Sequence, residues 1–494
     1  MNRHIAIDIG SESGRAIVGY LKDEKLYSEE IHRFRTQFMQ VRNRGMRNFY
    51  RYHEEILHSL SVYREKYGPK LSSIGVDAWG MDFVILDRGG NVLKMPAFYR
   101  EATRTSDVND IIEKKFGIRR LYERNGNQAL PSDTLNQLIR LKRDDDPCLD
   151  NPHGLLFVSD LFHYFLGAMP CNEYSLASYG RLYNVLTQEW DAEVFNAFGF
   201  PMTLCKPVVH AGDTIGTVDP AILAGAGLEG EVPIITPCGH DTASAAMAIP
   251  DTGDDWAFIS SGTWSLMGFE TPGPIINELA IEYNLSNDGL AMGVNLFKKN
   301  ITGTWLIQQC KDVWGKYSYD QLTDLAEAAK DEDLFIDVNA DDFYMPKNMP
   351  EAIARAVARD FGCEVDPSDA GRIARIIFQS MALKYRYYLD ILLRAADKTI
   401  SKMYITGGGS RNRVINQFTA NAIGNPVYTG VYEGTSVGNL LLQAYGSGEI
   451  KDKQELRQIV KNSFPQNEFL PADKAKWDEK YAIFMEKAAR PNEW

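Results

Sequence analysis

Short apolar runs alternate with polar turns near the start of the chain. The polar residues 22–25 separate two runs of strand length. The pattern predicts strands at 5–7, 16–21 and 26–34, a helix at 53–67, and a strand at 73–77. The three strands joined by tight polar turns are expected to pair as an antiparallel sheet.

A second, less regular copy of this order occupies the second half of the chain. An apolar strand at 256–259 runs into Ser260-Ser261-Gly262-Thr263. Residues 367–396 predict a long helix, because apolar side chains recur there every three or four positions. The pattern also predicts a return strand at 266–269, a strand at 402–406, and a helix that begins near Thr435.

The order of three strands, a helix and a strand also opens the ribonuclease-H-like unit of actin-type phosphotransferases. We therefore expect an α/β fold of two actin-like domains with a cleft between them. A chain of 494 residues is too long to fold around a single hydrophobic core. Turn-forming and charged residues at 250–255 predict a boundary near 245–255, which gives domains 1–248 and 249–494. Residues from about 100 to 210 have no counterpart in the second half, so we expect an insertion that builds substrate surface.

Composition and charge narrow the function classes. The chain is 44% hydrophobic and carries a formal net charge of −13, which argues against a nucleic-acid surface. No stretch reaches the roughly 18 apolar residues of a membrane span, and Asp8 interrupts the first apolar run. We therefore expect neither a membrane segment nor a signal peptide. The six cysteines are spread singly, which is typical of reduced thiols in a cytoplasmic protein.

Two loops rich in glycine and hydroxyl residues carry the first chemical signal. Residues 8–15 (Asp-Ile-Gly-Ser-Glu-Ser-Gly-Arg) and 260–265 (Ser-Ser-Gly-Thr-Trp-Ser) each follow a short apolar strand. Glycine lets the backbone approach an anion, and turn N–H groups with hydroxyls can donate to phosphate oxygens. The pair predicts that a nucleotide's phosphates lie between duplicated domains. Asp8 either holds Mg²⁺ there or caps a turn, and the second loop favours Mg²⁺.

A candidate general base follows in Gly239-His240-Asp241-Thr242. As a single residue, Asp241 is more readily interpreted as a helix N-cap. Beside two phosphate loops, its carboxylate suits a base that takes the proton of an attacking hydroxyl during phosphoryl transfer. We expect His240 to orient a group or line the pocket, because no metal-ligand spacing accompanies it.

Other polar positions have two interpretations each. Trp79-Gly80-Met81-Asp82 is either a core tryptophan beside a turn or a sugar platform, in which Gly80 admits the ligand and Asp82 accepts its hydroxyls. Lys298-Lys299-Asn300 and Gln308 alone would form a solvated face. The run Gly407-Gly408-Gly409 is a weak signal, because glycine runs mark many tight turns. Cys238 is interpreted as packing, since no cationic partner that would activate its thiol is visible.

With these residues in view, the chain resembles the FGGY family of carbohydrate kinases over nearly its whole length. The string Ser260-Ser261-Gly262-Thr263-Trp264-Ser265-Leu266-Met267-Gly268 is the strongest single match. The others are Asp8-x-Gly10…Ser13-Gly14-Arg15, Trp79-Gly80-x-Asp82-Phe83, Tyr99-Arg100, Gly239-His240-Asp241-Thr242, Lys299-Asn300-Ile301-x-Gly303-x-Trp305-Leu306-x-Gln308 and Gly407-Gly408-Gly409-Ser410-x-Asn412.

The resemblance implies roles for particular residues. It makes Asp241 the proton acceptor and implies a cleft between two actin-like domains, where ATP accompanied by Mg²⁺ phosphorylates the 1-hydroxyl of a 6-deoxyketose, L-rhamnulose. It implies ATP contacts from Ser11, Glu12, Ser13, Gly14, Arg15, Thr263, Gln308 and Gly409, and sugar contacts from Gly80, His240, Thr242 and Asn300. We expect a monomer or homodimer whose partners are these small molecules.

Departures from the family pattern gather on the sugar side and keep L-fuculose or another ketose open as the substrate. Glu12 adds a negative charge on the nucleotide side, which is tolerable only if its side chain points to solvent. The sugar-side departures are Glu101 for Asp, Asn287-Asp288-Gly289-Leu290 for Asn-Glu-Gly-Gly, Ser132-Asp133-Thr134-Leu135 for Phe-Asn-Thr-Leu, and Val158-Ser159-Asp160 for Met-Pro-Asp.

Two other function classes share parts of this pattern. An actin-fold ATPase that acts as a chaperone or filament subunit needs the phosphate loops but neither the platform at Trp79 and Asp82 nor Asp241. A weakened sugar sensor would explain the sugar-side departures, but the intact Asp8, Asp241 and Thr263 argue against it.

Overall fold

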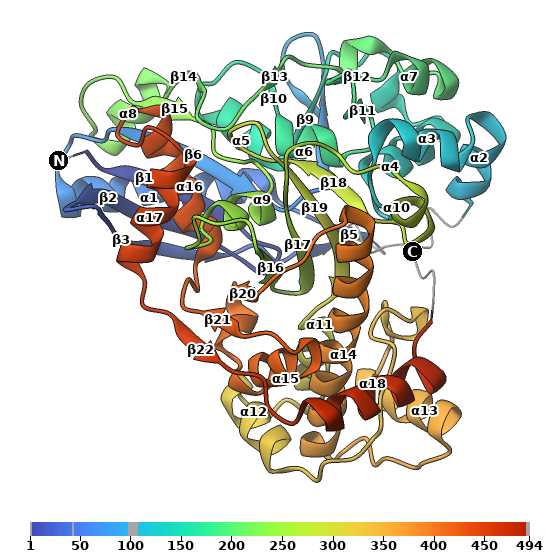
Figure 1. The fold of residues 1–494 in the computed structure, drawn as a ribbon. Helices are drawn as coiled ribbons and strands as arrows, with labels where there is room; N and C mark the ends of the chain where they lie inside the picture. The colour runs from blue at the N-terminus through green and yellow to red at the C-terminus, as the bar shows by residue number, and fades with distance from the viewer. Residues whose placement is uncertain (1, 42–43, 97–106, 491–494) are drawn as a thin grey trace.

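Two mixed β-sheets form the centre of the protein (Figure 1), in a computed structural model that describes residues 2–41, 44–96 and 107–490. The first sheet has the order β14-β15-β6-β1-β2-β3. Its strands are β1 (His4–Ile9), β2 (Ser13–Lys22), β3 (Lys25–Arg35), β6 (Ser73–Ala78), β14 (Thr214–Thr217) and β15 (Pro233–Ile235). β1, β2 and β3 pair antiparallel and β6 pairs parallel with β1, so the predicted opening of the fold is confirmed.

The second sheet repeats this arrangement with the order β18-β19-β17-β16-β20-β21-β22. β16 pairs antiparallel with β17 and parallel with β20, as β1 does with β2 and β6. The strands are β16 (Trp256–Ser261), β17 (Trp264–Thr271), β18 (Ser286–Gly289), β19 (Asn295–Thr302), β20 (Lys402–Thr406), β21 (Val427–Thr429) and β22 (Asn467–Phe469). Each phosphate loop predicted from the sequence is therefore the turn between the first two strands of its sheet.

Helices cover both sheets. α14 (Ala370–Ala396) packs in the core of the second half, which agrees with the helix predicted at 367–396. The helices outside the insertion are α1 (Phe49–Tyr67), α8 (Pro220–Ala226), α9 (Asp241–Met247), α10 (Glu278–Glu282), α11 (Trp305–Trp314), α12 (Tyr319–Ala328), α13 (Met349–Phe361), α15 (Arg413–Ile423), α16 (Gly434–Gly446), α17 (Lys453–Ser463) and α18 (Lys474–Lys487). None of the helices in the described part of the chain is long and apolar enough to cross a membrane.

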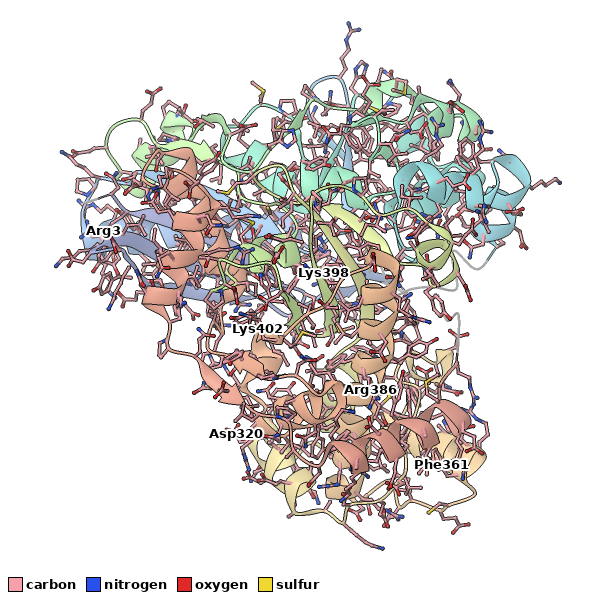
Figure 2. All side chains as sticks on the ribbon, in the orientation of Figure 1. Arg3, Asp320, Phe361, Arg386, Lys398 and Lys402 are labelled. Carbon is pink, nitrogen blue, oxygen red and sulfur yellow. The ribbon has the colours of Figure 1, made fainter. Side chains whose placement is uncertain are left out.

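The two halves share a third hydrophobic core. Ala6 and Ile17 of the first sheet pack there with Leu440 of α16 and Phe258 of the second sheet. Figure 1 shows α16 and α17, in orange and red, beside the blue strands β1 to β3. The connection at 250–255 is fixed by Lys402 (labelled in Figure 2), whose Nζ lies 2.9 Å from Asp251.

Residues of the insertion expected at about 100–210 pack with the preceding strands at 83–86 and 92–94, so this unit begins before residue 100. Its small sheet, β8-β7-β9, has a separate core with the helices around it. Its main elements are β7 (Phe83–Leu86), β8 (Val92–Lys94), β9 (Gly154–Phe157), α2 (Val108–Lys115), α3 (Ile118–Asn125), α4 (Thr134–Arg143), α5 (Val158–Leu166), α6 (Tyr174–Tyr179) and α7 (Ala192–Phe198). Two-residue strands β10 (Asn172–Glu173), β11 (Tyr183–Asn184), β12 (Glu189–Trp190) and β13 (Val208–Val209) connect them, and the hairpin β4 (Met39–Val41) and β5 (Arg44–Met46) precedes α1. The loop ends of both large sheets and α6 meet at one cavity.

Candidate active site

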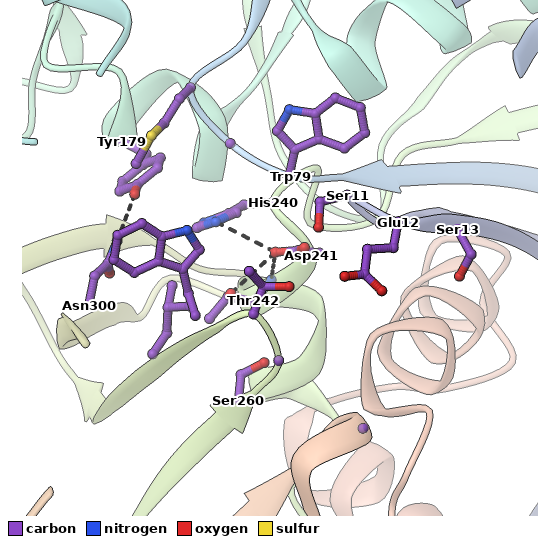
Figure 3. A pocket seen from close by; sticks show the side chains of 18 of the residues that line it. Ser11, Glu12, Ser13, Trp79, Tyr179, His240, Asp241, Thr242, Ser260 and Asn300 are labelled. Atoms are coloured by element: carbon purple, nitrogen blue, oxygen red, sulfur yellow. Dashed lines mark hydrogen bonds and ion pairs between the residues drawn. The ribbon is translucent and has the colours of Figure 1, made fainter. Parts of the chain in front are cut away.

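Three adjoining cavities lie where the loop ends of the two large sheets face each other. Their volumes are about 320, 490 and 150 Å³, and Gly262 and Gly408 line all three. The first cavity brings together Ser11 and Arg15 from one phosphate loop with Thr263 from the other. Figure 3 shows Asp241 near its centre, with Ser11, Glu12 and Ser13 on one side and Asn300 and Tyr179 on the other.

Two side chains hold the first phosphate loop by donating hydrogen bonds to its backbone carbonyl groups. Thr36 donates through its hydroxyl to the Gly10 carbonyl at 2.6 Å, and the buried Arg47 donates to the Ser11 carbonyl at 2.8 Å. Ser11, Glu12, Ser13 and Arg15 line the 320 Å³ cavity. Gly14 is buried beside them, and a Cβ there would lie 2.2 Å from the Phe34 ring. Gly14 is therefore the residue that fits under Phe34.

Glu12 is exposed, yet its side chain borders both the 320 and the 490 Å³ cavities. Partial burial, followed by the nearby Asp312, raises the pKa of Glu12, and Lys311 acts in the opposite direction. The Glu12 side chain is therefore exposed to solvent, as expected, but it faces the cleft.

The second phosphate loop and α11 form the opposite wall. The Thr263 hydroxyl donates to Gln308 Oε1 at 3.3 Å, and Gln308 Nε2 donates to Thr304 at 3.1 Å. Gln308 and Gly409 line the 490 Å³ cavity. A Cβ on Gly409 would lie 2.1 Å from Ser261 Oγ, so only glycine lets these loops approach this closely. The weak signal from the glycine run therefore corresponds to part of the cavity wall.

Asp241 is the first residue of α9, and His240 occupies the N-cap position without a capping side-chain hydrogen bond. The cap interpretation of Asp241 is therefore wrong. Its carboxylate accepts from the Thr242 backbone N–H at 2.6 Å and lies 3.6 Å from His240 Nε2, with 32% of the side chain exposed. Desolvation raises the pKa of Asp241, His240 opposes this shift, and Asp8 adds to it. A partly exposed carboxylate with a raised pKa suits a base.

The backbone before Asp241 is anchored from the insertion. The buried Glu173 carboxylate accepts from the Gly239 N–H at 2.8 Å, and Ser175 Oγ accepts from the His240 N–H at 3.0 Å. On the other side, the Ala78 N–H donates to the Gly239 carbonyl at 2.9 Å. Burial raises the pKa of Glu173 to about 7.

Asp8 lines the 150 Å³ cavity together with Asp241 and Glu433. Its carboxylate lies 3.4 Å from Arg15 Nε and accepts from the Ser436 hydroxyl at 3.2 Å. Burial, followed by the charge of Asp8, raises the pKa of Asp77 well above its ordinary value. The described residues contain no group of three or more metal-ligating side chains. Carboxylate oxygens beside a phosphate cavity nevertheless fit Mg²⁺ shared with phosphate groups, which needs only one or two protein carboxylates.

The other end of the cavity is lined by Trp79, Gly80, Tyr179, His240 and Asn300. The rings of Tyr179 and His240 stack with centroids 4.7 Å apart, and Asn300 Nδ2 donates to the Tyr179 hydroxyl oxygen at 2.8 Å. Flat rings beside amide and hydroxyl groups suit a polyhydroxylated ligand. Thr242 also lines this cavity.

Asp82 does not line the cavity. It is completely buried behind the wall, where its Oδ2 accepts from Trp79 Nε1 at 2.9 Å. Burial raises the pKa of Asp82 to about 6. Trp79 is also covered by the Arg47 guanidinium, 4.5 Å from the ring centroid. In this structure Asp82 orients the tryptophan, and a direct contact with a ligand's hydroxyls has no geometric support.

The interpretation of Lys298-Lys299-Asn300 as a solvated face is wrong. All three lie on β19, between β17 and β18, and at most 3% of each residue is exposed. Sequence reasoning also missed Tyr179, because the insertion that carries it had no predicted elements. In the sequence, Asp288 stood out only as a departure from the family pattern. Tyr99, Arg100 and Glu101 lie outside the described residues.

Two family models match the chain. The N-terminal domain model of the FGGY family of carbohydrate kinases matches residues 4–248, and the C-terminal domain model matches residues 257–447. A rhamnulokinase of Bacteroides thetaiotaomicron is 36% identical over 479 residues, which cover 97% of this chain and 98% of that protein. A rhamnulokinase of Bacillus subtilis is 34% identical over 471 residues, with 95% and 96% covered.

Solved structures agree in fold. A ligand-bound xylulose kinase from Lactobacillus acidophilus superposes with a TM-score of 0.81 at 14% identity, covering 98% of this chain and 97% of that one. A glycerol kinase with ADP from Plasmodium falciparum gives 0.77 at 13% identity, with 98% and 97% covered. The expected α/β fold of actin-like, ribonuclease-H-like domains is confirmed.

Proposed function

We propose, from the premise that this chain belongs to the FGGY family of carbohydrate kinases, that it transfers the γ-phosphoryl group of ATP to the 1-hydroxyl of a 6-deoxyketose, with L-rhamnulose as the substrate. The observation that carries the proposal is the position of Asp241 between the stacked Tyr179 and His240 on one side and the two phosphate loops on the other. That position suits a base that acts between a hydroxyl site and a phosphate site.

In the proposed reaction, the ketose lies against Tyr179, His240 and Asn300. Asp241 accepts the proton of the 1-hydroxyl while its oxygen forms a bond to the γ-phosphorus, and the bond from that phosphorus to the β,γ-bridging oxygen breaks to release ADP. The raised pKa of Asp241 makes its carboxylate a stronger base than an exposed aspartate. His240 Nε2 lies 3.6 Å from this carboxylate, which is consistent with a fixed orientation of the Asp241 side chain.

The nucleotide phosphates are assigned to the loop residues Ser11, Ser13, Arg15 and Thr263, with Gln308 and Gly409 on the 490 Å³ side. We assign Mg²⁺ to Asp8, where it would neutralise phosphate charge when bound. Arg15 also supplies a positive charge at this end of the cleft. These groups would offset the charge of an anionic ligand in an otherwise acidic chain.

The sugar assignment rests on the relatives and on the lining of the pocket. The rhamnulokinases that match this chain do so over nearly its full length. Trp79, Met81, Trp264 and Leu266 give the cavity apolar surface near the polar groups. A 6-deoxyketose presents both a methyl group and hydroxyls, so it suits such a mixed wall. L-Fuculose has the same groups and is the second candidate.

We further propose that the two domains are 1–248 and 249–494, and that the protein acts in the cytoplasm. The family models end and begin near this boundary. All six cysteines are unpaired, which suits a reducing compartment.

A coupled ADP-release assay tests the function. L-Rhamnulose, L-fuculose, L- and D-ribulose, L- and D-xylulose and glycerol are compared by kcat/KM. We expect L-rhamnulose to give the highest value. A higher value for another ketose corrects the sugar, whereas equal ATP hydrolysis with and without every sugar revives the actin-fold ATPase. Tight ketose binding without ADP production would favour the sensor.

A further inference from the structure

A buried ion pair lies directly behind the sugar end of the cavity. Asp288 of β18 and Lys298 of β19 are both completely buried, and Lys298 Nζ lies 3.1 Å from Asp288 Oδ2. Neither residue lines the cavity. Each, however, contacts a residue that does: Asp288 contacts His240, and Lys298 contacts Asn300.

Lys298 determines which way the Asn300 amide points. Its Nζ donates to Asn300 Oδ1 at 2.9 Å, and an ammonium group can only donate. The oxygen of the amide must therefore face Lys298, which directs Nδ2 to the Tyr179 hydroxyl oxygen at 2.8 Å. Because that oxygen accepts, the hydroxyl hydrogen of Tyr179 points away from Asn300. Lys298 also lies 4.6 Å from the centroid of the Tyr179 ring.

Asp288 acts in the same way on His240. Its Oδ2 lies 3.3 Å from His240 Nδ1, while His240 Nε2 faces Asp241 at 3.6 Å. Burial alone would raise the pKa of Asp288, but Lys298 and His240 hold it below its ordinary value. An ionised carboxylate beside Nδ1 favours the tautomer with hydrogen on that nitrogen. With Nδ1 turned toward Asp288, Nε2 is the ring nitrogen on the side of Asp241 and the cavity.

We infer that Asp288 and Lys298 are positioning residues for the ketose: one ion pair holds the orientation of the His240 ring and of the Asn300 amide, and so tunes the charge around the base Asp241. This inference rests on the proposed function, because the positioned groups are those assigned to the sugar. A buried ion pair is in general a weak source of stability, so its presence directly behind two ligand-facing groups calls for a role in the site.

The charged and titratable groups around this pair define the expected pH effects. His240 faces Asp288 from β18, Asp241 from α9 and Tyr179 from α6, and Asp241 is further influenced by Asp8. Replacing Asp288 with Asn leaves the Lys298 cation uncompensated, which stabilises the ionised form of Asp241. Replacing Lys298 with Met leaves the Asp288 anion uncompensated, which has the opposite effect.

The test compares the variants D288N, K298M and D288N/K298M with the wild type. We expect the acidic limb of the pH profile of kcat/KM for the ketose to move to lower pH in D288N and to higher pH in K298M, by about half a pH unit or more. The ketose KM should rise about tenfold in both single variants, whereas the KM for ATP stays within about twofold. The neutral double variant should return the limb close to the wild-type position.

A second buried ion pair supplies the matched control. Lys384 and Asp337 are both completely buried with Nζ and Oδ2 2.6 Å apart, in the half of the chain that carries α14. K384M should lower the thermal unfolding midpoint without moving the limb or the ketose KM. If D288N fails to fold, the test uses K298M and the neutral double variant: the limb should move to higher pH in K298M and return to the wild-type position in D288N/K298M.

Each outcome decides a separate point. The inference is overturned if the acidic limb stays in place in the two single variants or moves in the same direction in both. It is also overturned if the KM for ATP rises as much as the KM for the ketose. The ketose with the highest wild-type kcat/KM is used, so a different sugar preference corrects the proposed substrate alone. If the wild type phosphorylates no ketose, the proposed function is overturned. If the variants are active but their pH profiles are unchanged, only the inference about Asp288 and Lys298 is overturned.

Discussion

Several residues of this site draw their properties from groups that do not line the cavity. Asp241 has an anchored backbone because Glu173 and Ser175 accept from the two N–H groups before it. Trp79 is oriented by Asp82 and covered by Arg47. At this scale, the chemistry depends on buried polar groups supplied by the insertion and by the neighbouring strands.

Replacing Asp241 with Asn should remove most turnover and leave ATP binding near normal. The amide keeps the size of the side chain but cannot accept the proton of the 1-hydroxyl. ADP release and the dissociation constant for ATP are measured in parallel. More than about a tenth of the wild-type rate, a loss below about 1.4 kcal/mol, would contradict the assignment of the base.

Glu173 should make stability depend on pH in the opposite sense to a glutamate whose pKa is lowered by an ion pair. Burial raises the pKa of Glu173 from 4.5 to about 7, so the folded state binds the proton more tightly than the unfolded state. Its contribution to the free energy of unfolding is therefore present below about pH 4.5 and decreases as pH rises to about 7, by about 3 kcal/mol.

Thermal unfolding midpoints of the wild type and Glu173→Gln at about pH 5 and about pH 8 measure this difference. The advantage of the wild type over the variant should shrink at the higher pH. A constant difference would show that the carboxyl titrates normally in the folded protein.

At the scale of elements, the crossing of α9 and α16 joins the two halves. Gly438 lies at the crossing, and a Cβ there would lie 1.8 Å from the Ser244 carbonyl oxygen. The polar side chains of α16 continue the contact, since Asn439 donates to the Gly75 carbonyl at 3.2 Å and Gln443 donates to the Ile5 carbonyl at 3.0 Å. α16 is therefore seated on β1 and β6.

Gly438→Ala should destabilise the protein by about 2 kcal/mol or more, because the two backbones must separate to admit a methyl group. Gly225→Ala is the matched control. Gly225 lies in α8, and a Cβ there would meet no other element of the described chain within 4 Å, so alanine should be neutral or stabilise by up to about 1 kcal/mol. Thermal unfolding of both variants tests the crossing, and equal midpoints would contradict it.

The elements that the sequence predicted well are those with a strong local pattern. The three opening strands, α14 and β20 follow their apolar periodicity, and the boundaries differ by a few residues. The pattern could not predict that Lys298 and Lys299 are buried, because their partners Asp288 and the Tyr283 carbonyl come from segments without a regular apolar pattern. Tyr179 was missed for the same reason: short helices in the insertion depend on tertiary packing.

At the scale of the whole molecule, the cleft combines two lobes with an acidic interior. The shared core packs residues of both halves under the site, and Arg15 of the first half pairs with Glu433 of the second. Asp8, Asp241 and Glu433 line the same 150 Å³ cavity. A chain with a net charge of −13 therefore binds a polyanion only where cations and local donors offset these carboxylates.

This charge balance predicts that Asp8→Asn reverses its effect with Mg²⁺. With the ion present, the variant should bind ATP about tenfold more weakly than the wild type, because a ligand of Mg²⁺ is lost. With EDTA, it should bind ATP more tightly, because one negative charge is removed and the charge of Arg15, which lies 3.4 Å from Asp8 and stays paired with Glu433, is less compensated.

Isothermal titration of ATP into both proteins, with Mg²⁺ and with EDTA, measures the four affinities. Ser436→Ala removes the hydroxyl that donates to Asp8 without changing the charge. Its affinities for ATP should therefore stay close to those of the wild type, both with Mg²⁺ and with EDTA. Weaker binding of Asp8→Asn in EDTA as well as in Mg²⁺ would mean that Asp8 supports the loop rather than the ion. The reversal separates these roles because only an electrostatic contribution changes sign when the cation is withdrawn.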